Sequence, residues 1–166
     1  MPSTPKQKMT YAQALEKYRY ESETGKLFLR KHARCASISE REIPGLDAGG
    51  YVQVNAGRFG QIKGHRLAWL LHYGEWPEDH IDHINGVRND NRIENLRVVT
   101  NAVNCQNKRE PKNASGLMGV HFYKGAYRAK VQINRKQVHL GRFETAEEAH
   151  AAYLKAKREL HVGCTI

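Results

Sequence analysis

The spacing of hydrophobic residues predicts short helices and strands over the first half of the chain. The segment YAQALEKYRYESETGKLFLR (residues 11–30) has the pattern of a short helix, a turn and a strand, and residues 31–48 show no regular pattern. The segment GGYVQVNAGRFGQIKG (residues 49–64) is typical of a hairpin. HRLAWLLHYGEWP (residues 65–77) then predicts an apolar helix, which we expect to end at Gly74.

A polar stretch with two further strands follows this helix. HIDHI (residues 80–84) predicts a short strand, NGVRNDNR (85–92) a loop, and ENLRVV (94–99) a second strand. Thr100 is a suitable N-cap for a short helix. The expected order is therefore strand, loop, strand, helix, and KREPKNASG (108–116) after it has the composition of a linker.

The last third of the chain predicts three strands and one helix. A helix over residues 145–160 begins with a capping box formed by Thr145 and Glu148. The three β-patterned runs before it are MGVHFY (118–123), AYRAKVQI (126–133) and KQVHLGRF (136–143). We expect one buried stripe on the helix, made of Ala146, Ala149, Tyr153, Ala156 and Leu160.

The charge of the chain indicates a polyanionic partner. The 166 residues include 27 Lys and Arg against 17 Asp and Glu, a formal net charge of +10. A protein this basic usually meets nucleic acid, although ribosome-associated and membrane-surface proteins share the signature. Residues 112–166 carry ten Lys and Arg against four Glu, a net charge of +6, so the positive charge is densest there.

The cysteines and apolar runs favour a cytoplasmic location. Cys35, Cys105 and Cys164 lie far apart, which is neither a disulfide framework nor a structural zinc site. The longest apolar run, LAWLL, is too short to cross a bilayer, and the N-terminus lacks the apolar core of a signal peptide. We expect a soluble cytoplasmic protein, located in a bacterial host cell if a phage encodes it, with no membrane association.

Residues 79–108 carry the groups that phosphodiester hydrolysis needs. The reaction requires a base to deprotonate water, a cation to stabilise the developing charge, and rigid positioning. His83 is the natural base because imidazole titrates near neutrality. Asp82 and Asn104 supply a carboxylate and an amide oxygen, which suit Mg²⁺ or Mn²⁺. Neighbours on a regular strand face opposite ways, so Asp82 and His83 share a site only if the strand ends or bulges there.

This stretch resembles the HNH endonucleases, in the subgroup of phage and intron-encoded homing enzymes. Asp82-His83 matches the first element of the family pattern, Asn95 follows His83 by twelve residues, and Asn104 follows by nine more. The resemblance implies a ββα-metal module in which His83 is the general base and Asp82 and Asn104 bind the metal. It gives Asn95 a structural role, holding the loop by backbone hydrogen bonds.

The chain departs from many HNH enzymes at the end of the motif. The last ligand is Asn104 where many members have histidine, and Lys108 stands where some relatives place another histidine. We therefore expect one weakly held divalent ion, Mg²⁺ or Mn²⁺, in preference to zinc. His65 and His72 are expected to be scaffold residues, and His80 is expected to be an ordinary strand-flank residue, with a DNA contact as the alternative. The sequence leaves open whether Arg88, Arg92 and Arg97 bind phosphate or are merely solvated.

The C-terminal sheet is expected to present a polar face. Alternation directs Tyr127, Ala129, Val131 and Ile133 toward the helix. GVHFYKGAYRAKVQINRKQVHLGRFETAEEAHAAY resembles the plant ethylene-response-factor (apetala-type) DNA-binding domain, which implies that the opposite face reads DNA. The family's strand-one arginines are replaced here, so its sequence preference does not transfer. The candidate DNA-binding residues are His121, Tyr123, Arg128, Lys130, Gln132, Gln137 and His139.

Together these observations predict an α+β protein of two domains. Residues 1–111 would form the HNH endonuclease domain, with an N-terminal β-rich extension, and residues 112–166 a three-stranded antiparallel sheet packed on one helix. The predicted activity is metal-dependent cleavage of double-stranded DNA, with no obligate protein partner. A DNA-binding regulator carrying an inactive nuclease remnant and an RNA-binding protein remain as alternatives.

Overall fold

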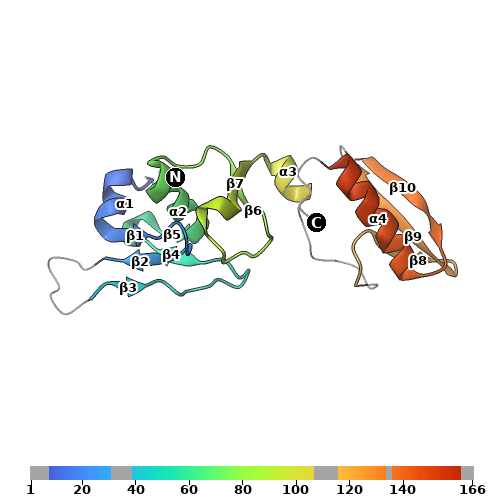
Figure 1. Ribbon diagram of the computed structural model, residues 1–166, viewed down its shortest axis with the longest axis horizontal. Helices are drawn as coiled ribbons and strands as arrows, with labels where there is room; N and C mark the ends of the chain where they lie inside the picture. The colour runs from blue at the N-terminus through green and yellow to red at the C-terminus, as the bar shows by residue number, and fades with distance from the viewer. Residues whose placement is uncertain (1–7, 31–38, 107–115, 134–135, 162–166) are drawn as a thin grey trace, which may run out of the picture. The chain divides into compact units, whose positions relative to one another are not determined.

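The computed structural model describes residues 8–30, 39–106, 116–133 and 136–161, and it separates into two compact units, residues 1–99 and 100–166 (Figure 1). Both units combine α-helices with small antiparallel sheets, which confirms the expected α+β class. The predicted domain boundary after residue 111 and most of the predicted linker lie outside the described residues, so that boundary stays a prediction. Within the described ranges, every helix is too short or too polar to cross a membrane.

The first unit begins with a short helix and a three-stranded antiparallel sheet. Thr10 caps the helix through a capping box with Gln13. The helix ends at Lys17, because Tyr18 adopts an extended backbone. Residues 18–20 then form a strand that the hydrophobic pattern did not distinguish from the helix. The elements are α1 (Tyr11–Lys17), β1 (Tyr18–Tyr20), β2 (Leu27–Leu29) and β3 (Arg41–Glu42), paired in the order β1-β2-β3.

The predicted hairpin and apolar helix are both confirmed. Strands β4 (Gln53–Asn55) and β5 (Gln61–Lys63) pair antiparallel across a 3-10 turn at Gly57–Phe59. Helix α2 (Gly64–Tyr73) follows directly and ends at Gly74, whose φ of 83° is a left-handed conformation that favours glycine. Five of its ten residues are buried, in keeping with an apolar helix inside a small domain.

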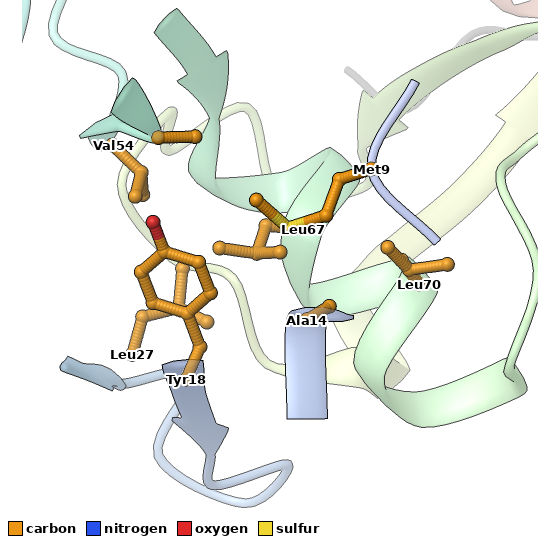
Figure 2. Close-up of a cluster of buried hydrophobic side chains, with 8 residues drawn as sticks. Met9, Ala14, Tyr18, Leu27, Val54, Leu67 and Leu70 are labelled. Carbon is orange, nitrogen blue, oxygen red and sulfur yellow. The ribbon is translucent and has the colours of Figure 1, made fainter. Parts of the chain in front are cut away.

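The main core of the first unit is formed where α1 and strands β1, β2 and β4 pack against α2 (Figure 2). Tyr18 and Leu27 come from β1 and β2, and Val54 from β4, while Leu67 and Leu70 come from α2. All five side chains are almost fully buried. Because segments 18–29 and 53–70 share this core, the N-terminal elements belong to the same folded body as α2.

The predicted strand–loop–strand pair is a second hairpin, β6 (His80–His83) and β7 (Leu96–Val99). Its register is regular, with Asp82 opposite Arg97. Ile81 and Leu96 pack on Ala68 of α2, which fixes the hairpin against the helix. Helix α3 (Asn101–Gln106) follows in the chain but belongs to the second unit, so the complete ββα-metal arrangement stays a prediction.

The second unit contains the predicted three-stranded sheet and its helix. Strands β8 (Val120–Tyr123), β9 (Ala126–Ile133) and β10 (Lys136–Phe143) pair antiparallel in the order β10-β9-β8, and α4 (Ala146–Leu160) packs on one face (Figure 1). The capping box at Thr145 is confirmed.

The predicted stripe of α4 is confirmed only in part. Ala149 and Ala156 are buried, and Tyr153 packs on the sheet core. Leu160 is 47% exposed, so its inclusion in the stripe was wrong, because the helix reaches its last residue there. Gly119 shows how closely helix and sheet approach, since an added Cβ would lie 2.0 Å from the Tyr153 ring.

Candidate functional site

His83 is the last residue of β6, and its imidazole lies in a buried cluster. The side chain is 4% exposed, and its Nε2 lies 3.1 Å from Oδ1 of Asn91. The rings of His65 and Tyr51 pack on it, with centroid distances of 5.2 and 5.9 Å. These three neighbours come from the β6–β7 loop, α2 and the segment before β4, so His83 is enclosed by residues from distant parts of the sequence.

Burial lowers the pKa of His83, because the charged imidazolium loses hydration. The hydrogen bond with Asn91 and the nearby carboxylate of Asp82 raise the pKa in opposition, but they are the smaller contributions. His83 is therefore neutral at physiological pH, which is the form that a general base needs.

Asp82 is buried on the same strand but contacts different groups. Its carboxylate is 8% exposed, and Oδ2 accepts hydrogen bonds from Nε and Nη2 of Arg97 at 3.0 and 2.8 Å. Asp82 and His83 are the last two residues of β6 and both keep the regular register with β7, so a site shared by the two neighbours stays a prediction. Any metal ion on this carboxylate must share it with Arg97 or displace the guanidinium.

Asn95 and Asp90 organise the loop that joins β6 to β7. Asn95 Oδ1 accepts from the backbone N–H of Asn85 at 2.9 Å, and its Nδ2 donates to the carbonyl of Asp90 at 2.8 Å. These are the backbone bonds that a loop-holding role requires. Hydrogen bonds from Arg92 lower the pKa of Asp90 to about 2, with a further one from Asn85, so its carboxylate is ionised and fixed in the loop.

Asn104 lies on α3, half-buried, and its backbone N–H donates to Thr100 at 3.0 Å. The N-cap role of Thr100 is confirmed, since its Oγ1 accepts from Val103. Because α3 belongs to the second unit, a joint ligand set of Asp82 and Asn104 stays a prediction.

The donor chemistry of that set fits a divalent metal. A carboxylate and an amide supply hard oxygen atoms, as Mg²⁺ and Mn²⁺ prefer. In the described ranges no group of three or more His, Cys, Asp or Glu is placed to hold a metal ion.

Sequence reasoning missed several residues around His83. The ring of His65, a residue expected to be scaffold, packs on His83, and His65 is itself 9% exposed. Arg97 pairs with Asp82, and Arg88 donates to the carbonyl of Gly49, so neither is merely solvated. Asn91 was not singled out at all. The only sequence signal for these residues was that they flank the motif, and contacts between distant segments cannot be read from such flanking positions.

The candidate DNA-binding residues share the sheet face opposite α4. Val120, Ala129 and Val131 are buried toward the helix, so their alternating neighbours point away from it. The register places His121 opposite Arg128 and continues this face across the sheet. The remaining pairs on this face are Lys130 with His139, Gln132 with Gln137, and Arg128 with Arg142, the last of which the sequence reasoning did not include.

One comparison with known families covers the segment that contains the first of these two candidate sites. Residues 63–106 match the family model described as HNH endonuclease. The match spans α2, β6, β7 and α3, and it supports an HNH nuclease, for which DNA is the implied substrate. HNH nucleases generally use a divalent metal ion. No curated protein and no solved structure matches the chain significantly, and the ethylene-response-factor resemblance has no support from these comparisons.

Proposed function

We propose that this protein is a metal-dependent endonuclease of the homing type, which hydrolyses phosphodiester bonds in double-stranded DNA. One observation carries the proposal: within the segment that matches HNH endonucleases, His83 is buried, neutral and hydrogen-bonded at the end of a strand, beside the carboxylate of Asp82. A histidine on a solvated loop would offer neither the lowered pKa nor the fixed ring.

His83 takes a proton from a water molecule in this mechanism. The water oxygen forms the new bond to phosphorus as its proton moves to the imidazole, and the bond from phosphorus to the 3′ oxygen breaks. When bound by Asp82 and Asn104, a divalent ion would supply positive charge to stabilise the leaving oxygen. Asn95 keeps the β6–β7 loop in shape through its two backbone hydrogen bonds.

The β8–β10 sheet would supply affinity and register on the duplex. Its face away from α4 carries Arg128, Lys130 and Arg142, and the three strands contain no acidic residue. The Arg128 guanidinium lies 4.3 Å from the Tyr123 ring centroid, so a cation and an aromatic ring are held together on the face. An antiparallel sheet with such a face is compatible with the major groove of DNA.

Cleavage of supercoiled plasmid tests the proposed activity. With Mg²⁺ or Mn²⁺ the protein should produce nicked or linear DNA, and a chelator should stop the reaction. His83→Ala should reduce the rate by about 10²- to 10⁴-fold, the usual contribution of a general base, while DNA binding stays within a few-fold. His72→Ala, on the exposed side of α2, is the matched control and should cut normally.

The competing function is a DNA-binding regulator with an inactive nuclease remnant. The ion pair of Arg97 with Asp82 favours it, because this guanidinium occupies the carboxylate where the metal should bind. If the purified protein binds DNA but cuts none of it with either metal, the regulator is the better assignment. If His83→Ala cuts as fast as the parent, His83 is not the general base.

A further inference from the structure

Asn91 is the most deeply buried polar side chain in contact with His83. It lies in the β6–β7 loop and is 1% exposed, and its Oδ1 faces Nε2 of His83. Its Nδ2 is also buried and has no hydrogen-bond partner in the part of the chain that the structure describes. A half-satisfied buried amide destabilises a fold, because the unpaired N–H has lost its water. Stability alone therefore does not explain an amide at this position.

We propose that Asn91 is a positioning residue that selects the tautomer of His83. An amide oxygen can only accept, so the proton of the neutral ring must lie on Nε2. The lone pair then lies on Nδ1, which becomes the atom that takes the proton from water. The proposal rests on the proposed function of His83 as the base, and it assigns the side chain that orients that base.

The rings around His83 complete the positioning. His65 meets the imidazole at an interplanar angle of 87°, and Tyr51 packs at 46°. Ring packing limits the rotation of the imidazole but does not decide which nitrogen carries the proton. That choice needs a hydrogen bond, and the contact to Asn91 Oδ1 supplies it.

Residues of β1 and the β1–β2 turn fix the backbone of the loop that carries Asn91. Tyr20 Oη donates to the Asn91 carbonyl at 2.7 Å, and the next turn of the loop is tied down where Ile93 N–H donates to Ser22 O at 3.2 Å. Gly25 has a φ of 74°, and a Cβ there would lie 2.5 Å from the backbone nitrogen of Arg92. Only glycine allows the β1–β2 turn to approach the loop so closely.

These contacts make the β1–β2 hairpin part of the catalytic unit. They come from residues outside the segment that matches the HNH family, 63–106. The chain therefore supports its base with elements that the family motif does not contain.

Nitrogen NMR of the full-length protein tests the tautomer directly. With ¹⁵N-labelled histidine, long-range proton–nitrogen correlations show which ring nitrogen is protonated, and the His83 signals are identified from their loss in His83→Gln. We expect the Nε2–H form in the parent protein and a mixture of both tautomers in Asn91→Ala. Asn91→Asp keeps an oxygen opposite Nε2 and, at a pH high enough for the ring to be neutral, should restore the Nε2–H form. These spectra need neither DNA nor metal.

Cleavage kinetics supply the second readout. Asn91→Ala should lower kcat by about 10- to 100-fold, as expected when a catalytic group is misplaced, with KM for DNA nearly unchanged. Asn91→Asp should recover part of this loss only above neutral pH, because a carboxylate beside the ring stabilises the imidazolium. Asn89→Ala is the matched control, because Asn89 is an exposed asparagine of the same loop.

Two results would overturn the assignment. One is an Nδ1–H tautomer in the parent protein, which would mean that the amide donates to the ring. The other is an Asn91→Ala protein with the parent's tautomer. If no variant or parent cuts DNA, the proposed function fails, whereas the tautomer spectra still decide whether Asn91 orients His83.

Discussion

Acid should unfold the first unit through His65. This histidine lies at the start of α2, packed between Tyr51 and His83, and burial lowers its pKa to about 3, with repulsion from His83 adding to the shift. In the unfolded chain the same side chain titrates near 6.5. Between these values the unfolded state binds the proton and the folded state does not, so the stability from neutral His65 is present above pH 6.5 and is lost as pH falls toward 3.

The size of the effect follows from the difference in pKa. Each pH unit below 6.5 removes about 1.4 kcal/mol, so the free energy of unfolding should fall by about 2 kcal/mol between pH 7.5 and pH 5. The lowered pKa of His83 acts in the same direction. The lowered pKa values of Asp47 and Asp90 act only below about pH 4, because an unfolded aspartate titrates near that pH. The window from pH 7.5 to 5 therefore isolates the histidines.

Urea unfolding followed by tryptophan fluorescence measures the change in unfolding free energy of the first structural unit. The chain has two tryptophans, Trp69 and Trp76, and both lie in the first unit. His65→Gln, which cannot take up a proton, should lose about 2 kcal/mol less than the parent over the same pH range. His72→Gln, on the exposed side of α2, should behave like the parent. Equal acid sensitivity of the parent and His65→Gln would refute the argument.

Two further predictions concern the metal ligand and the sheet. Arg97→Gln removes the cation that pairs with the buried Asp82 carboxylate, so the free energy of unfolding should fall by the order of 3 kcal/mol. Added Mg²⁺ should restore part of this loss, because a bound ion stabilises the folded state. Melting curves with and without Mg²⁺ measure the effect, and an equal loss in both would contradict metal binding at Asp82. Lys130→Ala should reduce the slope of log K for DNA binding against log salt concentration by about 0.9, without slowing single-turnover cleavage. Lys155→Ala, on the exposed side of α4, should leave this slope unchanged. An unchanged slope in Lys130→Ala would show that Lys130 does not contact DNA.

The elements of this fold could be predicted because their signals are local. Thr145 and Glu148 form a capping box three residues apart, and Gly74 ends α2 by adopting a positive φ. Alternation along β9 correctly assigned Ala129 and Val131 to the buried face. Strand β1 was missed because Tyr18–Tyr20 is too short to show a period of two next to a helix.

The surroundings of His83 could not be predicted because they depend on tertiary contacts. Tyr51, His65 and Asn91 meet only after three separate segments have packed together. No spacing in the sequence predicts that these three residues are in contact. A histidine at the start of an apolar helix has the same local sequence pattern whether its ring packs on another histidine or on the hydrophobic core. The sequence motif singled out His83, but the residues that surround it could be identified only from the fold.

Asp82 and His83 are adjacent in sequence, yet the fold gives them electrostatically opposite surroundings. The carboxylate faces a cation, Arg97, while the imidazole faces a neutral amide, Asn91. The difference suits the proposed chemistry, because a carboxylate must be ionised to bind a metal ion and an imidazole must be neutral to act as a general base. A carboxylate in the place of Asn91 would stabilise the imidazolium and so weaken the base at neutral pH. A neutral residue in the place of Arg97 would remove the cation that faces the buried anion in the metal-free protein. The regular register of the β6–β7 hairpin achieves this separation, since it sets Arg97 directly opposite Asp82 while His83 ends the strand and meets the loop.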